Sequence, residues 1–229
     1  MKATQGATVG FASAAMLVSY LPFSAVNGVL GAIGSAAGVG TSGLQWVTDA
    51  FTVALTGAVL SGGALAERYG RRRVTVLGLA LTVVGCLTGF VAGGIAGAGA
   101  VHGLWAGQAV AGIGAGLVMS ATLSLIAATA PTPAARTRAI ALWAAANVAG
   151  LGSGPFLSAA VPSWRWIFPP VALLSLGVAA FGAVRSHEVR AGTAARPDRL
   201  GQLAGTAGVL ALVYGVIQAA PRAGPTPER

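Results

Sequence analysis

Long stretches without a charged residue constrain this chain more than any other feature of its sequence. Taking His102 as neutral, the uncharged stretches are 3–48, 50–66, 74–135, 139–164, 166–184 and 200–221. A helix needs about 20 consecutive, mostly apolar residues to cross a bilayer, because in hydrocarbon every backbone N–H and C=O must find its partner within the segment. The spacing of charges therefore predicts an all-α integral membrane protein.

The composition excludes several other classes of protein. Only 8% of the 229 residues are charged and 55% are hydrophobic, whereas soluble domains carry about 25% charged residues. The net charge of +9 does not indicate nucleic-acid binding, because the cations lie in short gaps between the uncharged stretches rather than on one face with stacking aromatics. Cys86 is the single cysteine, so no disulfide can form within the chain.

The two longest uncharged stretches are too long for one span each. Both contain glycine-rich segments, at 34–43 and 93–103, where we expect the chain to turn. Dividing them there predicts about seven spans, at 9–32, 46–65, 74–95, 103–128, 138–160, 166–184 and 200–220.

The distribution of Lys and Arg over the connections predicts the orientation in the membrane. With the N-terminus in the cytoplasm, three cations lie outside, Arg165, Arg222 and Arg229, and the other 11 of the 14 lie inside. Because Lys and Arg resist translocation, cytoplasmic connections carry the excess. The sequence therefore predicts a multi-pass protein of the cell membrane with a cytoplasmic N-terminus.

The connection between the second and third spans carries the most specific motif. It reads Gly63-Ala-Leu-Ala-Glu67-Arg68-Tyr-Gly70-Arg71-Arg72-Arg73 and resembles the signature loop of the major facilitator superfamily, G-x-L-A-D-R-x-G-R-R/K, with Glu67 in place of Asp. Gly70 permits a tight turn between antiparallel spans. The resemblance implies that Glu67 and Arg68 engage a helix end in the other half of a transporter and latch one conformation. The expected latch residues are Gly63, Glu67, Arg68, Gly70, Arg71 and Arg72.

Further segments resemble the fourteen-helix drug/proton antiporters of that superfamily, in the same order. They are Val26-Asn27, Trp46-Val-Thr-Asp49, Gln108 within a glycine-rich span, Gly150-Leu-Gly-Ser-Gly154-Pro155, Ser163-Trp-Arg-Trp-Ile-Phe168 and Asp198-Arg-Leu-Gly201. Gly150 and Gly154 allow close helix packing, and Pro155 removes a donor and kinks a helix. The resemblance implies an N-terminal six-helix transporter half over 1–184, a cytoplasmic loop over 185–199, a linker helix over 200–220 and a polar tail over 221–229.

Proton-coupled export needs an ionisable group that faces the substrate path. The antiporters supply an Asp in the first helix and an Arg in the fourth, where this sequence has Pro22 and Gln108. Asp49 is the one acid within an expected span. We expect one of two roles: it binds a proton or a cationic substrate, or it is a solvated acid near a helix start. The candidates for transport and coupling are therefore Asp49, Asn27 and Gln108.

These observations predict a transporter and not an enzyme. The two histidines fall in connections, so no expected span offers a histidine that could act as the base for Ser153 as a nucleophile. No cluster of residues has the spacing of metal ligands. We therefore expect no cofactor and no metal. The expected function is efflux of small amphipathic molecules, with proton coupling left open. Because the resemblance covers one half of the family's fold, the alternative is a truncated or half-length membrane protein that does not transport alone. Such a protein acts only with a partner half, supplied by a second copy or by a separate C-terminal half.

Overall fold

The computed structural model describes residues 2–186 apart from Ala96, together with isolated positions between 201 and 215. The expected loop at 185–199, linker helix at 200–220 and tail at 221–229 lie almost wholly outside the described residues. Within the described residues, six helices are long and apolar enough to cross a membrane. The elements are α1 (Lys2–Ala37), α2 (Thr41–Tyr69), α3 (Arg71–Ala92), α4 (Ala98–Thr129), α5 (Pro133–Ala159), the short 3₁₀ helix η1 (Trp164–Ile167) and α6 (Phe168–Arg185).

The two glycine-rich turns, between α1 and α2 and between α3 and α4, are shorter than the glycine content predicted. Residues 34–37 and 98–103 are helical, and the chain leaves helical geometry only at 38–40 and 93–97. Each connection contains a glycine with positive φ, Gly38 at 65° and Gly97 at 68°, a conformation that side chains disfavour. The other glycines stay in the helices, because within a bilayer a helix satisfies its own backbone groups.

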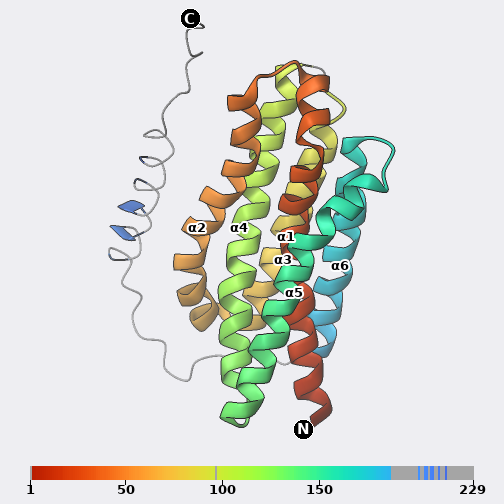
Figure 1. The fold of residues 1–229 in the computed structure, drawn as a ribbon. Coiled ribbons are helices and arrows are strands. Elements are labelled where there is room, and N and C mark those ends of the chain that lie inside the picture. The colour runs from red at the N-terminus through yellow and green to blue at the C-terminus, as the bar shows by residue number, and fades with distance from the viewer. Residues whose placement is uncertain are drawn as a thin grey trace, which may run out of the picture.

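The six long helices run side by side along one axis (Figure 1). Helix α4 packs against α1, α2 and α3, and α1 packs against α4, α5 and α6. Helices α2 and α5 make no contact with each other. The order across one layer is therefore α2, α4, α1, α5, and α3 and α6 cover the back of α4 and α1.

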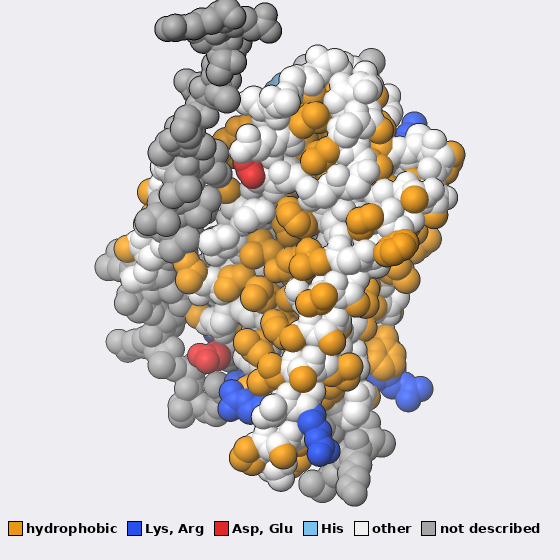
Figure 2. Space-filling model, viewed as in Figure 1, with side chains coloured by type: hydrophobic (Ala, Val, Ile, Leu, Met, Phe, Trp, Pro, Cys, Tyr) orange, Lys and Arg blue, Asp and Glu red, His pale blue; other side chains and the backbone are white. Residues whose placement is uncertain are grey.

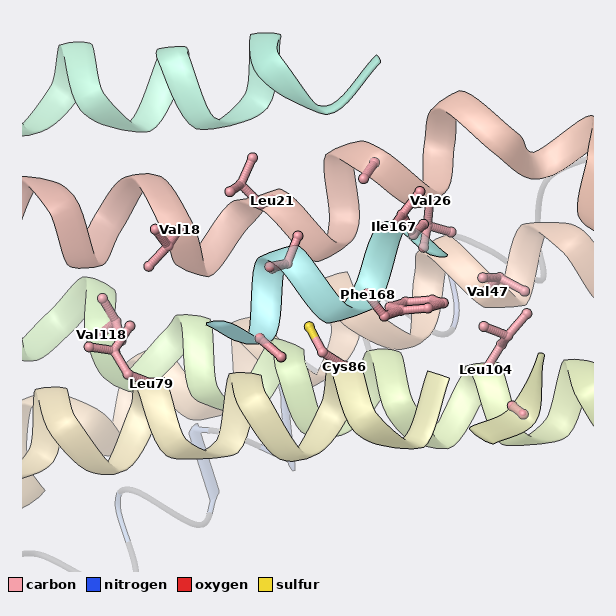
Figure 3. Close-up of a cluster of buried hydrophobic side chains, with 14 of the residues drawn as sticks. Val18, Leu21, Val26, Val47, Leu79, Cys86, Leu104, Val118, Ile167 and Phe168 are labelled. Atoms are coloured by element: carbon pink, nitrogen blue, oxygen red, sulfur yellow. The ribbon is translucent and has the colours of Figure 1, made fainter. Parts of the chain in front are cut away.

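The core lies between α1, α3, α4 and α6. Figure 3 shows Val18 of α1, Leu79 and Cys86 of α3, Val118 of α4 and Phe168 of α6 converging in one cluster of buried side chains. This cluster buries one side of each of the four helices, and it leaves α2 and α5 attached at the edges of the bundle.

Glycines set the spacing between α3 and α4. A Cβ built on Gly85 would lie 2.5 Å from the Gly107 carbonyl oxygen, and one built on Gly107 would lie 2.8 Å from the Gly85 carbonyl oxygen. The two backbones are thus in direct contact, which is how helices associate where lipid supplies no hydrophobic driving force.

Glycines that allow close backbone approach also join α1 to α5, and hydrogen bonds add to this contact. The missing side chains of Gly150 and Gly154 leave room for the α1 backbone at Leu17 and Ser24. The Ser24 hydroxyl donates to the Leu151 carbonyl, and the Ser158 hydroxyl donates to the Ala25 carbonyl at 2.7 Å. Gly150 and Gly154 therefore act through close approach to α1. Pro155 is exposed, and its Cα lies 3.4 Å from a Cβ built on Gly28 of α1.

Candidate functional site

Helices α2 and α5 each expose most of their surface. In the most apolar 18-residue window of each helix, 17% of α2 and 11% of α5 is buried, against 67% of α1 and 61% of α4. The sides of α2, α4, α1 and α5 that turn away from α3 and α6 form what we call the open face. Figure 2 shows hydrophobic side chains over the middle of the molecule in this view and charged side chains toward its ends.

An aromatic cluster joins α1 to α2. The ring of Phe51 lies 5.1 Å from that of Phe23 and 6.0 Å from that of Tyr20, measured between centroids. The Tyr20 hydroxyl donates to the Met119 sulfur of α4 at 3.7 Å and is hydrogen-bonded to Asn147 of α5. Tyr20 thus contacts the other three helices of the layer, α2, α4 and α5. Phe51 is fully buried, whereas Tyr20 and Phe23 are half-buried. These two side chains offer apolar surface and a hydroxyl together, the combination that binds amphipathic molecules.

Pro22 and Gln108 face each other inside the bundle. The Gln108 side-chain nitrogen donates to the Pro22 carbonyl at 3.3 Å. Gln108 is buried, and its side-chain oxygen has no hydrogen-bond partner among the described residues. Where the antiporters that the sequence resembles carry an acid and an arginine, this chain therefore has a neutral contact between α1 and α4.

Asp49 lies inside α2 rather than at its start. The helix begins at Thr41, so Asp49 is two turns beyond the N-terminus, whereas the helix dipole acts mainly within the first turn. Gln45 is hydrogen-bonded to the carboxyl group, and Asp49 Oδ2 is buried without a partner in the part of the chain that the structure describes. A carboxylate with an unpaired buried oxygen is free to take a proton or a donor from a ligand.

The three candidates for transport and coupling are not brought together. Asn27 is exposed, and its side-chain nitrogen donates to the Phe23 carbonyl one turn earlier. No hydrogen bond within the described chain links Asn27, Asp49 and Gln108. Sequence analysis missed Tyr20, Phe23 and Asn147. The spacing of Tyr20, Phe23 and Asn27, at i, i+3 and i+7, would have placed them on one side of a helix.

The expected latch loop is a single residue long. Gly70 separates α2 from α3 with φ of 104°, in a region that favours glycine. Glu67 and Arg68 are exposed, and a Cβ built on Gly63 would meet no other atom of the described residues within 4 Å. Arg71 is half-buried, and its Nε lies buried without a hydrogen-bond partner among the described residues.

Arg72 links this loop to the end of α6. Its Nη1 donates to the carbonyl of Ala183 at 3.0 Å and to that of Ser186 at 3.1 Å. The last carbonyls of a helix have no partner within the helix, and they carry partial negative charge. Arg72 therefore caps the C-terminus of α6.

We predict that Arg72→Gln loosens the last turn of α6. Loss of a charged donor from a partly exposed cap costs about 1 kcal/mol. Hydrogen exchange of the amides near Ala183 should become about fivefold faster, while exchange in α3 stays unchanged. Arg138→Gln is the control, since Arg138 is exposed and makes no hydrogen bond to the described part of the chain. Equal effects of the two variants would contradict the capping role.

Within the described residues, no group of three or more His, Cys, Asp or Glu side chains could hold a metal ion. The open face therefore offers aromatic rings, hydroxyl and amide groups and one carboxylate. These are groups for binding and for carrying a proton.

Comparison with curated proteins finds antibiotic-resistance proteins. The chain is 31% identical to the methylenomycin A resistance protein of Bacillus subtilis (strain 168), over 91% of this chain and 44% of that protein. It is also 31% identical to the puromycin resistance protein pur8 of Streptomyces alboniger, over 90% of this chain and 40% of that protein. The chain thus spans less than half the length of these relatives.

Solved structures share the fold. The human organic anion transporter MFSD10 superposes with a TM-score of 0.67 at 18% identity, over 96% of this chain and 58% of that one. The proton:xylose symporter XylE superposes with a TM-score of 0.65 at 15% identity, over 95% of this chain and 52% of that one.

The family model described as Major Facilitator Superfamily matches residues 12–221. This match covers all the described helices except the start of α1. Together with the six spans and the shared fold, it shows that this multi-pass membrane protein belongs to the major facilitator superfamily.

Proposed function

We propose that the chain forms half of a transporter that exports small amphipathic molecules across the cell membrane. The observation that carries the proposal is the open face, where Tyr20, Phe23 and Phe51 form an aromatic cluster beside the Asn147 amide. Amphipathic ligands bind where apolar surface surrounds a few polar groups. The resistance to methylenomycin A and puromycin named for the relatives supports this class of substrate.

In this proposal the open face lies along the substrate path. Transporters of this kind bind their substrate near the bilayer midplane between two halves that rock against each other. The edges of the open face are α2 and α5, the two helices with the least buried surface. In this proposal a second copy of the chain supplies the other six-helix half, which completes the path and meets Glu67 and Arg68.

The orientation follows from the charges at the two ends of the bundle. One end, which we call the arginine-rich end, carries Arg68, Arg71, Arg72, Arg73, Arg136, Arg138 and Arg185. At the opposite end Arg165 is the one Lys or Arg among the described residues. The positive-inside rule supports an orientation with the arginine-rich end and the N-terminus in the cytoplasm.

Drug accumulation in cells tests the function. Cells that express the chain should accumulate less puromycin, and tolerate more of it, than cells with an empty vector. Phe23→Ala should restore accumulation, because it removes a half-buried ring of the aromatic cluster while the buried Phe51 stays in place. Leu173→Ala is the matched control, since Leu173 of α6 is exposed on the far side of the bundle.

The alternative role, a membrane protein that acts only with a partner half, predicts a different pattern. In that case the chain alone gives no efflux and runs as a monomer after crosslinking, and efflux requires a co-expressed second half. Efflux by purified chain in proteoliposomes, with a crosslinked dimer, would instead favour two copies of this chain.

A further inference from the structure

An apolar groove runs along the outer surface of α3 toward the opposite end of the bundle. Its volume is about 370 Å³, and it is lined by Val84, Leu87, Thr88, Val91, Ala92, Ile95 and Gly103. From Val84 to Ala92 the groove follows α3 for about 12 Å at 1.5 Å per residue. It therefore lies parallel to the helix axis, as a lipid acyl chain does.

Small residues make the floor of the groove and large ones its wall. Ala92 is buried, and a Cβ built on Gly103 would lie 2.6 Å from the Ala92 Cβ. Leu87, Val91 and Ile95 are exposed by 52%, 65% and 52%. These side chains stand above the floor on a surface that faces the bilayer, away from the open face.

A cation lies where the groove ends. Arg165 of η1 places its guanidinium carbon 4.7 Å from the centre of the Phe90 ring and 5.7 Å from that of Trp166. Its Nη1 is 3.9 Å from the position of a Cβ on Gly94, the residue before Ile95 of the groove. Stacking on the two rings thus holds the guanidinium beside the end of the apolar groove.

The guanidinium lacks an acceptor. Its Nε is buried, and the Arg165 side chain makes no hydrogen bond or ion pair within the described residues. Arginine carries five N–H donors in a planar fork that matches the oxygens of a phosphate. Arg165 is also the one Lys or Arg at this end of the described bundle, so an anion here has a single place to bind.

We propose that the groove and Arg165 together bind an anionic phospholipid. The phosphate accepts hydrogen bonds from the guanidinium Nη atoms, and one acyl chain occupies the groove along α3. Phosphatidylglycerol has the required chemistry, a negative charge at the level of the headgroups and an acyl chain that runs along the bilayer normal. A site of this kind is separate from the substrate path, because it lies on the lipid side of α3.

Native mass spectrometry of the detergent-solubilised chain tests the proposal. The chain is titrated with dioleoyl phosphatidylglycerol, dioleoyl phosphatidylcholine and glycerol phosphate. We expect the anionic lipid to bind about fivefold or more tightly than phosphatidylcholine, the effect of one basic residue near an anionic headgroup. Glycerol phosphate should not compete, since it has no acyl chain.

Two variants separate the headgroup from the groove. Arg165→Gln should reduce binding of phosphatidylglycerol to the level of phosphatidylcholine, whereas Arg185→Gln at the other end should not. Thr88→Phe fills the groove and should weaken both lipids, whereas Leu77→Phe, also exposed on α3 but outside the groove, should leave both unchanged. The proposal is wrong if Arg165→Gln preserves the preference for the anionic lipid, or if glycerol phosphate competes as well as the whole lipid.

Discussion

Gly154→Val should strongly destabilise the packing of α1 against α5 and lower the stability of the whole chain. A Cβ at this position would run into the backbone of α1 at Ser24 and Ala25. A flexible side chain can rotate away from an intruding group, but a helix backbone cannot, so α1 and α5 must separate. Overpacking a core commonly costs about 1–3 kcal/mol, and we expect the upper end of that range or more here.

Separation of the two helices would also remove hydrogen bonds. The Ser24 hydroxyl donates to the Leu151 carbonyl, and the Ser158 hydroxyl donates to the Ala25 carbonyl. Leu151 and Ser158 lie about one turn of α5 before and after Gly154. Each such bond between transmembrane helices contributes about 0.6 kcal/mol. The loss therefore adds to the steric cost instead of relieving it.

Gly152→Val is the matched control for this experiment. Gly152 lies in the same helix, is exposed, and has no atom within 4 Å of a built Cβ. Both variants change helix propensity equally, so the difference between them measures packing alone. In detergent the unfolding midpoint of Gly154→Val should fall roughly 10 °C below that of Gly152→Val. Equal midpoints would show that α1 and α5 do not pack through Gly154.

Much of the fold was predictable because the membrane restricts the chain to helices. Stretches without charge located the six described spans, and the cations marked their ends. The exact turns were not predictable, since glycine serves two purposes here. Gly38 and Gly97 supply positive φ in connections, whereas Gly85 and Gly107 sit in helices and let two backbones touch. Composition does not distinguish these uses.

The candidate site was less predictable than the fold. Motif positions identified Gln108 and Asn27, but their contacts depend on how the helices are rotated. Gln108 turns inward to the Pro22 carbonyl, and Asn27 bonds back to its own helix. Phe51 and Tyr20 meet only because Gly112 admits the backbone of α2 at Phe51. Such contacts arise from packing between helices and leave no pattern within one segment.

Asp49→Asn is expected to abolish proton-driven accumulation of substrate. Among the described residues within the spans, Asp49 is the one acid away from the arginine-rich end. Its Oδ2 is buried and has no hydrogen-bond partner among the described residues. Asp49 lies two turns inside α2, so stabilisation of its charge by the dipole at the helix start does not account for its position. An asparagine keeps the shape and the contact with Gln45 but cannot carry a proton.

The size of this effect follows from the driving force. One pH unit across the membrane corresponds to about 1.4 kcal/mol per proton, which supports about a tenfold concentration ratio of substrate for one-to-one exchange. Everted vesicles with an acidic interior should therefore accumulate puromycin about tenfold per pH unit when they carry the functional transporter, with a partner half where one is needed. With Asp49→Asn the accumulation should fall to that of vesicles without the transporter, because only passive entry and protonation of the amine remain.

Two comparisons show whether proton carriage by Asp49 explains the loss. Asp49→Glu keeps a titratable carboxyl group and should retain accumulation, whereas Gln45→Ala removes only the neighbouring amide and should retain its dependence on the pH gradient. The unfolding midpoint of Asp49→Asn should match that of the unmodified chain, since the substitution leaves the buried core untouched. If Asp49→Asn vesicles still accumulate puromycin in proportion to the pH gradient, the proton is carried elsewhere and Asp49 serves another purpose on the open face.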